Sequence, residues 1–347
     1  MLFALTPRMF LDQLPLAERL LRAAGGFRHI SLVVDQAVTA NLDALLQRLD
    51  LAAEIEIIPA PADGELWGWA QDRFLVCCAG AETVVVGSAS SAAGETPLCA
   101  ASARGIAGHA SVPLRFEGGN ILADAETCFI GADLVTGDGF GRFAPHVESR
   151  RALRAIGCSR PLARRGPARF EIEPGDRRWR QDVDRCIARS GSRQPVFHID
   201  MFMTLAGRNR VLVGDPVWAS AVIGVKLPDG FPAFAFDEIA ASLRDDGFEV
   251  VRNPLPFVYF DDPRAKLREW FYASANNCWV EWVEGERGRI WLPEYGFGAW
   301  PELKATDDLN AAIWCALGFD VIRTGDFLPL AADLGSLNCI SKILARG

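Results

Sequence analysis

The chain has 347 residues, half of them hydrophobic, and a formal net charge of −8. This acidic balance argues against a nucleic-acid partner and against a basic membrane-binding face, and it suits a cationic ligand. No apolar run reaches the roughly 18–20 residues of a transmembrane helix, and the start of the chain lacks the basic segment of a signal peptide. The nine cysteines are scattered without a framework spacing, which predicts free thiols in a reducing cytoplasm.

The first part of the chain predicts alternating strands and helices. Leucines at helical spacing mark residues 9–24, and a β-branched run marks a strand at 29–35. We expect strands at 1–6, 29–35, 54–59, 74–78 and 83–86, and helices at 9–24 and 41–50.

The remainder of the chain continues this alternation. Residues 276–283 and 289–292 are expected to pair as a hairpin. Residues 137–141 form a glycine-rich loop, and the arginine-rich residues 159–194 are interpreted as an insertion with one helix at 178–188. We expect further strands at 114–124, 128–131, 197–202, 210–213, 248–259, 320–324 and 337–343, and helices at 237–246 and 307–317.

Clusters of predicted strands recur about five times, with a helix between most of them. No Ser/Gly-rich or Pro-rich linker divides the chain. The sequence therefore predicts a single α+β domain spanning residues 1–347 and built from recurring units.

A histidine and an aspartate stand two residues apart in the predicted strand 197–202. Residues two apart in a strand point to the same face, so His198 and Asp200 are expected to project together. Burying such a pair is costly without a purpose. The pair could complete a core by hydrogen bonding, or it could serve chemistry; a zinc site would need further ligands, and no HxxxH or CxxC lies nearby.

Two other segments combine a carboxylate with unusual neighbours. In Trp67-Gly68-Trp69-Ala70-Gln71-Asp72, an acid follows two tryptophans. Asp72 is either a solvated charge or the base of an aromatic-walled pocket for a flat cation. In Glu117-Gly118-Gly119-Asn120, a Gly-Gly pair within a predicted strand indicates a bulge or a place where another group approaches the backbone.

The last segment is Gly335-Ser336-Leu337-Asn338-Cys339. A cysteine is more often a small packed residue than a nucleophile, and we assign Cys77, Cys78, Cys128 and Cys315 to the core on that basis. Cys339 differs because the turn before it could present its sulfur at a strand edge.

In this order, Trp-x-Gln-Asp, Glu-Gly-Gly-Asn, His-x-Asp and Asn-Cys resemble the guanidine-modifying superfamily of the pentein fold, which includes agmatine, arginine and peptidylarginine deiminases and amidinotransferases. The resemblance spans residues 67–342 and includes two later stretches, 272–277 and 291–296. It implies a five-bladed pseudo-symmetric α/β propeller with the active site on its axis. The sequence departs from the usual pattern at Ser336, where these deiminases have a second glycine, and at Asn338, where many have histidine.

The resemblance also implies a mechanism. Asp72 and Asp200 would grip the guanidinium, with Trp69 and Asn120 also binding substrate, and Cys339 would attack its carbon to form an amidino-thioether. His198 would act as general acid and then base, oriented by Glu117, without a metal or other cofactor. The expected activity is a cytoplasmic deiminase that releases ammonia from a small guanidine or an arginine side chain and leaves a ureido group. An amidinotransferase and a binding protein that has lost catalysis are the alternatives, and the oligomeric state is open.

Overall fold

The computed structural model describes residues 1–10, 13–60, 66, 68–72, 74–79, 82–87, 109–111, 116–124, 126–136, 152–163, 168–186, 191–282 and 285–344. Trp67, the glycine-rich loop at 137–141 and the side chains of Cys77 and Cys78 lie outside this description. The chain divides into two compact units. Unit 1 comprises Met1–Gly119, Gly141–Glu148 and Leu337–Gly347, and unit 2 comprises Asn120–Phe140 and Ser149–Ser336.

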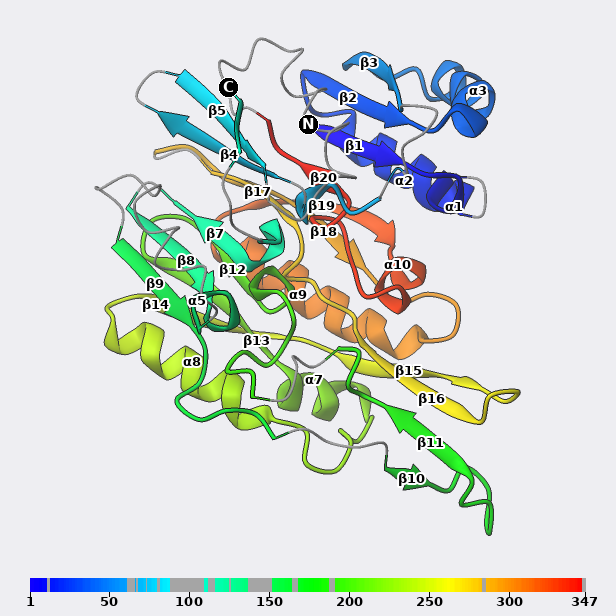
Figure 1. Ribbon diagram of the computed structural model, residues 1–347, viewed down its shortest axis with the longest axis vertical. Helices are drawn as coiled ribbons and strands as arrows, with labels where there is room; N and C mark the ends of the chain where they lie inside the picture. The colour runs from blue at the N-terminus through cyan, green and yellow to red at the C-terminus, as the bar shows by residue number, and fades with distance from the viewer. Residues whose placement is uncertain are drawn as a thin grey trace. The chain divides into compact units, whose positions relative to one another are not determined.

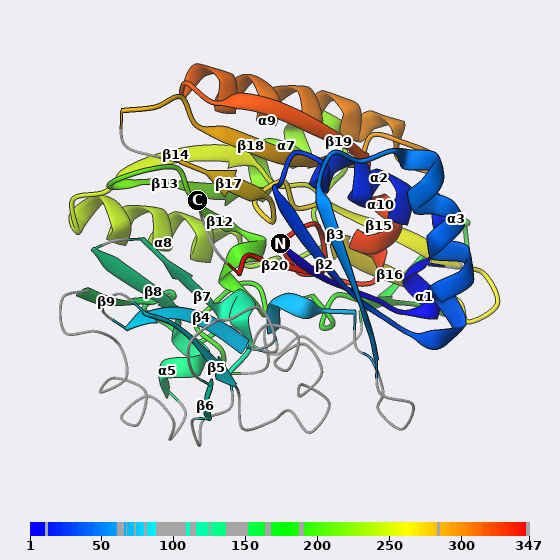
Figure 2. The ribbon, with the colours of Figure 1, turned by 90° about the horizontal axis from the view of Figure 1, so that it is seen from above.

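Unit 1 is built on a sheet that joins the two ends of the chain. Parallel strands β1 (Leu2–Leu5), β2 (His29–Val34) and β3 (Glu54–Pro59) lie side by side, and β20 (Ser341–Lys342) pairs antiparallel with β1. Helices α1 (Pro7–Phe10), α2 (Leu14–Ala24) and α3 (Thr39–Leu49) accompany these strands, as Figure 2 shows for α2 and α3. The predicted strands and helices of this region are confirmed to within a few residues, except that 9–24 breaks into α1 and α2.

The second sheet of unit 1 contains β4 (Phe74–Ala79), β5 (Glu82–Gly87) and β6 (His109–Ser111). A 3₁₀ turn, η2 (Ala70–Asp72), precedes β4. Ala70 and Phe74 pack with Leu2, Val33 and other residues of the first sheet in one apolar cluster. The η2 turn is therefore anchored on the core of unit 1.

Unit 2 contains three sheets of three strands. Strands β7 (Ile121–Ala123), β8 (Thr127–Gly131) and β9 (Ala152–Ile156) form one. Strands β12 (Met203–Leu205), β13 (Arg210–Asp215) and β14 (Glu249–Pro254) form another. The third consists of β17 (Trp279–Glu281), β18 (Arg289–Glu294) and β19 (Asp320–Asp326), in which β17 and β18 form the predicted hairpin.

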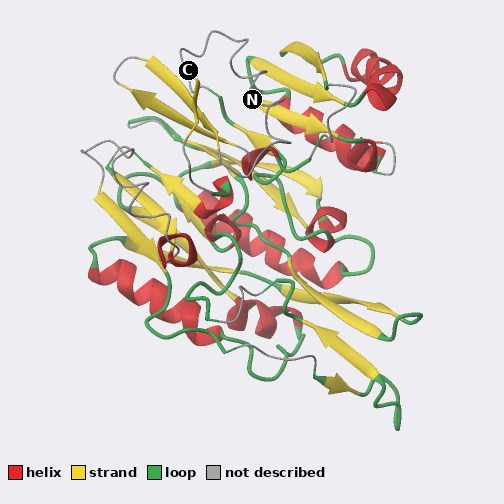
Figure 3. Ribbon diagram, viewed as in Figure 1, coloured by secondary structure: helices red, strands yellow, loops and turns green. Residues whose placement is uncertain are grey.

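Five of the six sheets in the described part of the chain share one pattern. In each, a first strand pairs antiparallel with the second, and the second pairs parallel with the third. A parallel pair requires a crossover connection, which is usually a helix. Within unit 2, α8 (Ala233–Asp245) packs on β13 and β14, and α9 (Lys304–Ala316) packs on β18 and β19 (Figure 3).

Local sequence explains where the helices of unit 2 begin and end. Helix α7 (Pro216–Ile223) has proline at its first position, and the Asp215 side chain accepts a hydrogen bond from the Trp218 N–H. Gly224 follows with a φ of 70°, a left-handed conformation that glycine adopts at little cost. Two short helices, α5 (Ala132–Thr136) and α10 (Leu328–Ala332), complete the unit.

The remaining sheet departs from the repeated pattern. Strands β10 (Arg169–Phe170), β11 (Trp179–Asp182), β16 (Leu267–Tyr272) and β15 (Phe257–Asp262) lie in that order, and Figure 1 shows them as an arm of unit 2. The helix predicted at 178–188 is wrong, because residues 179–182 pair parallel with β16. The Trp270 indole N–H also donates to Gln181 at 3.0 Å, so tertiary pairing outweighs the local preference.

Three predicted strands are largely turns. Of residues 116–124, the part of the predicted strand 114–124 that the structure describes, only 121–123 are extended, after the 3₁₀ turn η4 (Gly118–Asn120). The predicted strand 197–202 contains the 3₁₀ turn η6 (Ile199–Met201), and 337–343 is a turn followed by the two-residue β20. Residues 198–202 are all buried, so the alternation that distinguishes a half-buried strand is absent there.

Two further observations concern the burial of the cysteines and the length of the helices. Cys128 is buried as predicted, but Cys315 lies exposed on α9, so its assignment to the core is wrong. Among the described helices, none combines the length and the apolarity needed to cross a bilayer.

Candidate active site

The polar residues singled out by the sequence recur at one position of the repeated sheet pattern. In four of the five sheets they lie in the turn just before the first, antiparallel strand. Asp72 precedes β4, Asn120 precedes β7, His198 and Asp200 precede β12, and Cys339 precedes β20. Asp72, Glu117 and Cys339 belong to unit 1, whereas Asn120, His198 and Asp200 belong to unit 2.

In unit 1, Asp72 is held by backbone from a distant part of the chain. Its carboxylate is 9% exposed, and one oxygen accepts a hydrogen bond from the Gly119 N–H at 3.0 Å. The Asp72 N–H donates to the Trp69 carbonyl at 3.3 Å, and Trp69 is half-buried. A carboxylate that accepts from backbone N–H is favoured in its charged form, which suits a group that binds a cation.

The Gly-Gly pair is explained by this contact. A Cβ on Gly118 would lie 2.0 Å from the Gln71 carbonyl oxygen, so only glycine allows the η4 turn to approach η2 this closely. The predicted close approach is confirmed, and the approaching group is the backbone of Gln71. Glu117, immediately before Gly118, is exposed.

Cys339 is joined to the same turn. Cys339 is 3% exposed, and its backbone carbonyl accepts a hydrogen bond from the Gln71 N–H at 3.1 Å. Three residues later, the ammonium group of the buried Lys342 donates to the Gln71 carbonyl at 3.3 Å and to its side-chain oxygen at 3.2 Å. Unit 1 therefore brings together the segments that carry Asp72, Glu117 and Cys339, which are far apart in sequence.

In unit 2, His198 caps the η6 turn in an extended conformation, with φ −126° and ψ 142°. The exposed fraction of His198 is 4%, and its ring meets that of Phe197 edge-on at 4.8 Å between centroids. Asp200 is 1% exposed within the turn. His198 is extended and Asp200 lies inside a 3₁₀ turn, so the predicted strand with a shared face does not exist.

The η6 turn is fixed from another segment of unit 2. The Ser274 hydroxyl donates to the Met201 carbonyl at 2.6 Å, and the Thr204 hydroxyl donates to the Asn276 carbonyl at 2.7 Å. Burial, together with the nearby charge of Asp200, raises the pKa of the Cys278 thiol to about 12. The Asp200 carboxylate therefore acts electrostatically on the segment that contains Cys278.

Asn120 supports the chain that leads into His198. Its side-chain amide donates to the Phe197 carbonyl at 3.0 Å and accepts from the Gln194 amide at 2.8 Å. Gln194 is fully buried and also donates to the Phe197 carbonyl at 2.9 Å. These bonds give Asn120 a role in placing His198, which the sequence did not reveal.

The fourth sheet of the repeated pattern adds residues that sequence reasoning did not select. Asn276 and Asn277 occupy the turn before β17, the position equivalent to the other site residues, and both are buried. Asn276 exchanges hydrogen bonds with Asn253, whose amide also donates to Asn310 at 2.8 Å. The signal that could have identified them is the pair of adjacent amides at the start of a predicted hairpin strand.

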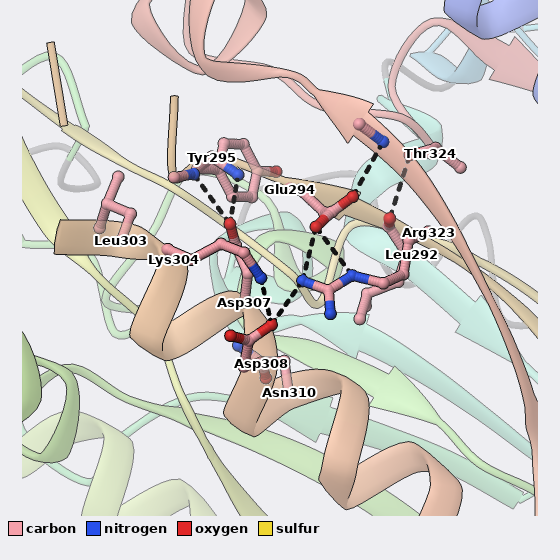
Figure 4. A network of polar contacts seen from close by, with 12 residues as sticks. Leu292, Glu294, Tyr295, Leu303, Lys304, Asp307, Asp308, Asn310, Arg323 and Thr324 are labelled. Atoms are coloured by element: carbon pink, nitrogen blue, oxygen red, sulfur yellow. Dashed lines mark hydrogen bonds and ion pairs between the residues drawn. The ribbon is translucent and has the colours of Figure 1, made fainter. Parts of the chain in front are cut away.

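A charged network stabilises the end of β18 in unit 2 (Figure 4). The guanidinium of Arg323 binds Glu294 at 2.6 Å and Asp308 at 2.7 Å. Asp307, which is 2% exposed, accepts from the N–H groups of Tyr295 at 3.0 Å and Gly296 at 2.8 Å. Burial raises the pKa of Asp307 to about 6.

Two further buried thiols of unit 2, Cys158 and Cys186, are made less reactive by their surroundings. Burial raises the pKa of Cys186 and of Cys158 above the ordinary value of a thiol. In the described ranges, no group of three or more His, Cys, Asp or Glu side chains is arranged to hold a metal ion.

The sequence matches no protein-family model, and no curated protein matches it. Solved structures match nearly the full chain. A substrate-bound agmatine deiminase from C. jejuni gives a TM-score of 0.64 at 11% identity, covering 98% of this chain and 91% of that one. A second agmatine deiminase structure from C. jejuni gives 0.61 at 12% identity, covering 97% and 90%.

A candidate arginine deiminase from Porphyromonas gingivalis gives a TM-score of 0.60 at 14% identity and covers 94% of this chain and 87% of that one. At such identities the likeness concerns the fold. This chain has the α+β pentein fold, and the resemblance inferred from the four motifs is confirmed at that level.

Proposed function

We propose that this protein is a guanidine deiminase, a hydrolase that releases ammonia from an arginine-like or peptidylarginine substrate and leaves a ureido group. The observation that carries the proposal is the recurrence of Asp72, His198, Asp200 and Cys339 at equivalent turns of the repeated sheet pattern. A fold shared with agmatine deiminase structures supports it.

We further propose that the five repeated sheets act as the blades of one propeller, so that residues 1–347 form a single catalytic domain with 159–194 as an insertion. The turns before the first strands would then supply one site with Asp72, Glu117, Asn120, His198, Asp200 and Cys339. We place the protein in the cytoplasm because the six cysteines whose state the structure describes are free thiols.

The chemistry follows from the residue types. Asp72 and Asp200 bind the N–H groups of the guanidinium, which fixes the substrate and keeps it charged. The Cys339 thiolate donates an electron pair to the guanidinium carbon and forms a C–S bond. His198 protonates one nitrogen of the tetrahedral adduct, the C–N bond breaks, and ammonia leaves an amidino-thioether.

The second half returns the enzyme to its starting state. His198 takes a proton from water, whose oxygen attacks the amidino carbon. The C–S bond then breaks, its electron pair returns to the Cys339 sulfur, the added hydroxyl group loses its proton to solvent, and the neutral ureido product is released. Glu117 orients His198 and stabilises its charged form.

The test is to measure ammonia and ureido product together over agmatine, arginine, methylated arginine and an acylated arginine peptide. Turnover of at least one is expected, and Cys339→Ser should abolish it. Cys315→Ser, which changes an exposed cysteine, is the matched control and should retain full activity. Product that depends on an added amine, without ammonia, would indicate amidino transfer, and binding without any product would indicate a non-catalytic protein.

A covalent probe tests the nucleophile directly. A chloroacetamidine-type reagent resembles the guanidine and carries a leaving group, so it should alkylate Cys339 ahead of the other cysteines. The raised pKa of Cys158, Cys186 and Cys278 keeps those thiols protonated near neutral pH. Labelling spread evenly over the cysteines would contradict the assignment.

A further inference from the structure

A series of buried hydrogen bonds connects two segments of unit 2 that border the proposed catalytic residues. The Tyr295 hydroxyl lies 2.7 Å from the Ser274 carbonyl and 2.5 Å from the Ser336 hydroxyl. The Ser274 hydroxyl in turn donates to the Met201 carbonyl within η6. Ser336 is three residues before Cys339, and η6 follows His198.

The direction of these hydrogen bonds is settled by counting protons. A tyrosine hydroxyl has one hydrogen, and a carbonyl can only accept. Tyr295 therefore donates to Ser274, and the Ser336 hydroxyl donates to Tyr295. We call this hydrogen-bonded set, Ser336–Tyr295–Ser274, the relay. None of its members is more than 1% exposed, so a lost partner would leave a polar group buried and unsatisfied.

Tyr295 itself is fixed by its backbone. Its N–H and that of Gly296 both donate to one oxygen of Asp307 on α9, as Figure 4 shows for Tyr295. A Cβ on Gly296 would lie 2.3 Å from the Lys304 backbone nitrogen, so the chain at 295–296 packs directly on the start of α9. The phenol is thus held on a rigid support before it reaches Ser336.

The relay also accounts for a departure in the sequence. The segment before Cys339 has Gly335-Ser336 where the resembling deiminases have two glycines. A glycine at 336 has no hydroxyl, so it could not donate to Tyr295. Serine at this position and tyrosine at 295 form a matched pair, which gives Ser336 a structural reason.

We propose that Tyr295 is a positioning residue for the proposed nucleophile: through Ser336 it fixes the chain that enters the Cys339 turn, and through Ser274 it ties that chain to η6. This rests on the proposed function for its effect on turnover, but the ordering of the Cys339 turn is independent of it. Tyr295 does not touch the substrate in this role.

The experiment compares Tyr295→Phe, Ser336→Ala and the double variant with a matched control. The chain has three tyrosines. Tyr272 is the control, because it is also buried and, within the described ranges, its hydroxyl has no hydrogen-bond partner. Three readouts are taken: kcat and KM, the rate of Cys339 alkylation, and backbone hydrogen exchange of the peptide covering residues 337–342.

Tyr295→Phe and Ser336→Ala should each lower kcat and the alkylation rate by about 10-fold to 100-fold, with KM changed little, because a small misplacement slows attack more than it weakens binding. The double variant should lose no more than either single variant, since both remove the same contact. Hydrogen exchange at 337–342 should become about 10-fold faster. Tyr272→Phe should behave as wild type in all three.

Unchanged exchange and unchanged kcat in Tyr295→Phe would overturn the proposal while leaving the deiminase assignment intact. Losses that multiply in the double variant, or an equal loss in Tyr272→Phe, would overturn it as well. Faster exchange in a protein whose wild type neither turns over guanidines nor labels at Cys339 would support the positioning of this turn and refute the proposed function. If Tyr295→Phe fails to fold, Ser336→Ala alone gives the same three readouts.

Discussion

Two 3₁₀ turns, η2 in unit 1 and η6 in unit 2, each place a buried aspartate just before the first strand of a three-stranded sheet. They differ in what supports them. The η2 turn is held by segments at both ends of its unit, through Gly119, Cys339 and Lys342. The η6 turn is supported by the Ser274 hydroxyl, within unit 2. The same local structure is therefore stabilised by close backbone packing together with a lysine donor in η2, and by a buried hydroxyl donor in η6.

The sharpest test of this equivalence is to neutralise both aspartates. Asp72→Asn and Asp200→Asn should each lower kcat/KM for a guanidine by about 1000-fold, because an amide presents donors where the guanidinium needs acceptors. Asn at 72 can still accept from the Gly119 N–H, so the thermal midpoint of that variant should stay close to wild type. Steady-state kinetics with a thermal melt decides the matter, and near-normal turnover in either variant would remove that residue from the site.

Glycines that pack against the supporting residues of the two units differ in how well they tolerate an added methyl group. Gly118→Ala should lower the free energy of unfolding by ~3 kcal/mol, because its Cβ meets the Gln71 backbone, which cannot move aside. Gly131→Ala in unit 2 is the matched variant. Its Cβ meets the side-chain oxygens of Gln194 and Asn120, which can shift only by weakening their buried hydrogen bonds, so a smaller cost of ~2 kcal/mol is expected. Urea unfolding measures both, and a larger effect at 131 would reverse the comparison.

The stability of unit 2 is expected to depend on pH through Asp307. Burial raises the pKa of Asp307 from an ordinary 3.8 to about 6, so the folded state binds this proton more tightly than the unfolded chain. The Asp307 carboxyl therefore contributes stability at pH values below its pKa in the unfolded chain. This contribution is lost as the pH rises through about 6. Asp307→Asn retains an acceptor for the N–H groups of Tyr295 and Gly296. Its free energy of unfolding should exceed that of wild type by up to ~3 kcal/mol at pH 8, and the difference should disappear toward pH 4.

The neighbouring Asp308 provides a control of opposite sign. Hydrogen bonds from Lys304 and Arg323 hold its pKa below the usual range, so its contribution is present at neutral pH and is lost as the pH falls. Because Asp308 is half exposed, Asp308→Asn should cost less than ~1 kcal/mol at pH 8. Unfolding curves across this pH range distinguish the two, and parallel profiles for Asp307→Asn and wild type would contradict the assignment.

Modest effects are also expected from removing single donors to the two turns. Lys342→Met removes the donor to the Gln71 carbonyl at 3.3 Å, and Ser274→Ala removes the donor to the Met201 carbonyl at 2.6 Å. Each should cost ~1–2 kcal/mol in free energy of unfolding, and the shorter bond at Ser274 should cost more. Calorimetry on the two variants ranks them, and a neutral Ser274→Ala would contradict the support assigned to η6.

Much of the secondary structure could be predicted from local pattern. Strand β3 begins and ends where expected. Helices α8 and α9 are found within a few residues of their predicted limits, because the spacing of their apolar residues matches one buried helix face. The failures fall at 114–124, 178–188, 197–202 and 337–343. In each, contacts with distant segments decide the backbone, as the pairing of β11 with β16 illustrates.

The candidate residues could likewise be selected by type, since a buried His-x-Asp, a Gly-Gly pair and a late Asn-Cys are unusual enough to resemble one fold. The sequence alone determined that fold resemblance and the identity of Asp72, His198, Asp200 and Cys339 as candidates. Only the tertiary structure decided that their turns are equivalent members of one repeated sheet pattern, and that Asn276 and Asn277 occupy another. It also decided why glycine is required at 118 and serine is favoured at 336. The physical reason is that these requirements come from Gln71 and Tyr295, which are distant along the chain and adjacent only after folding.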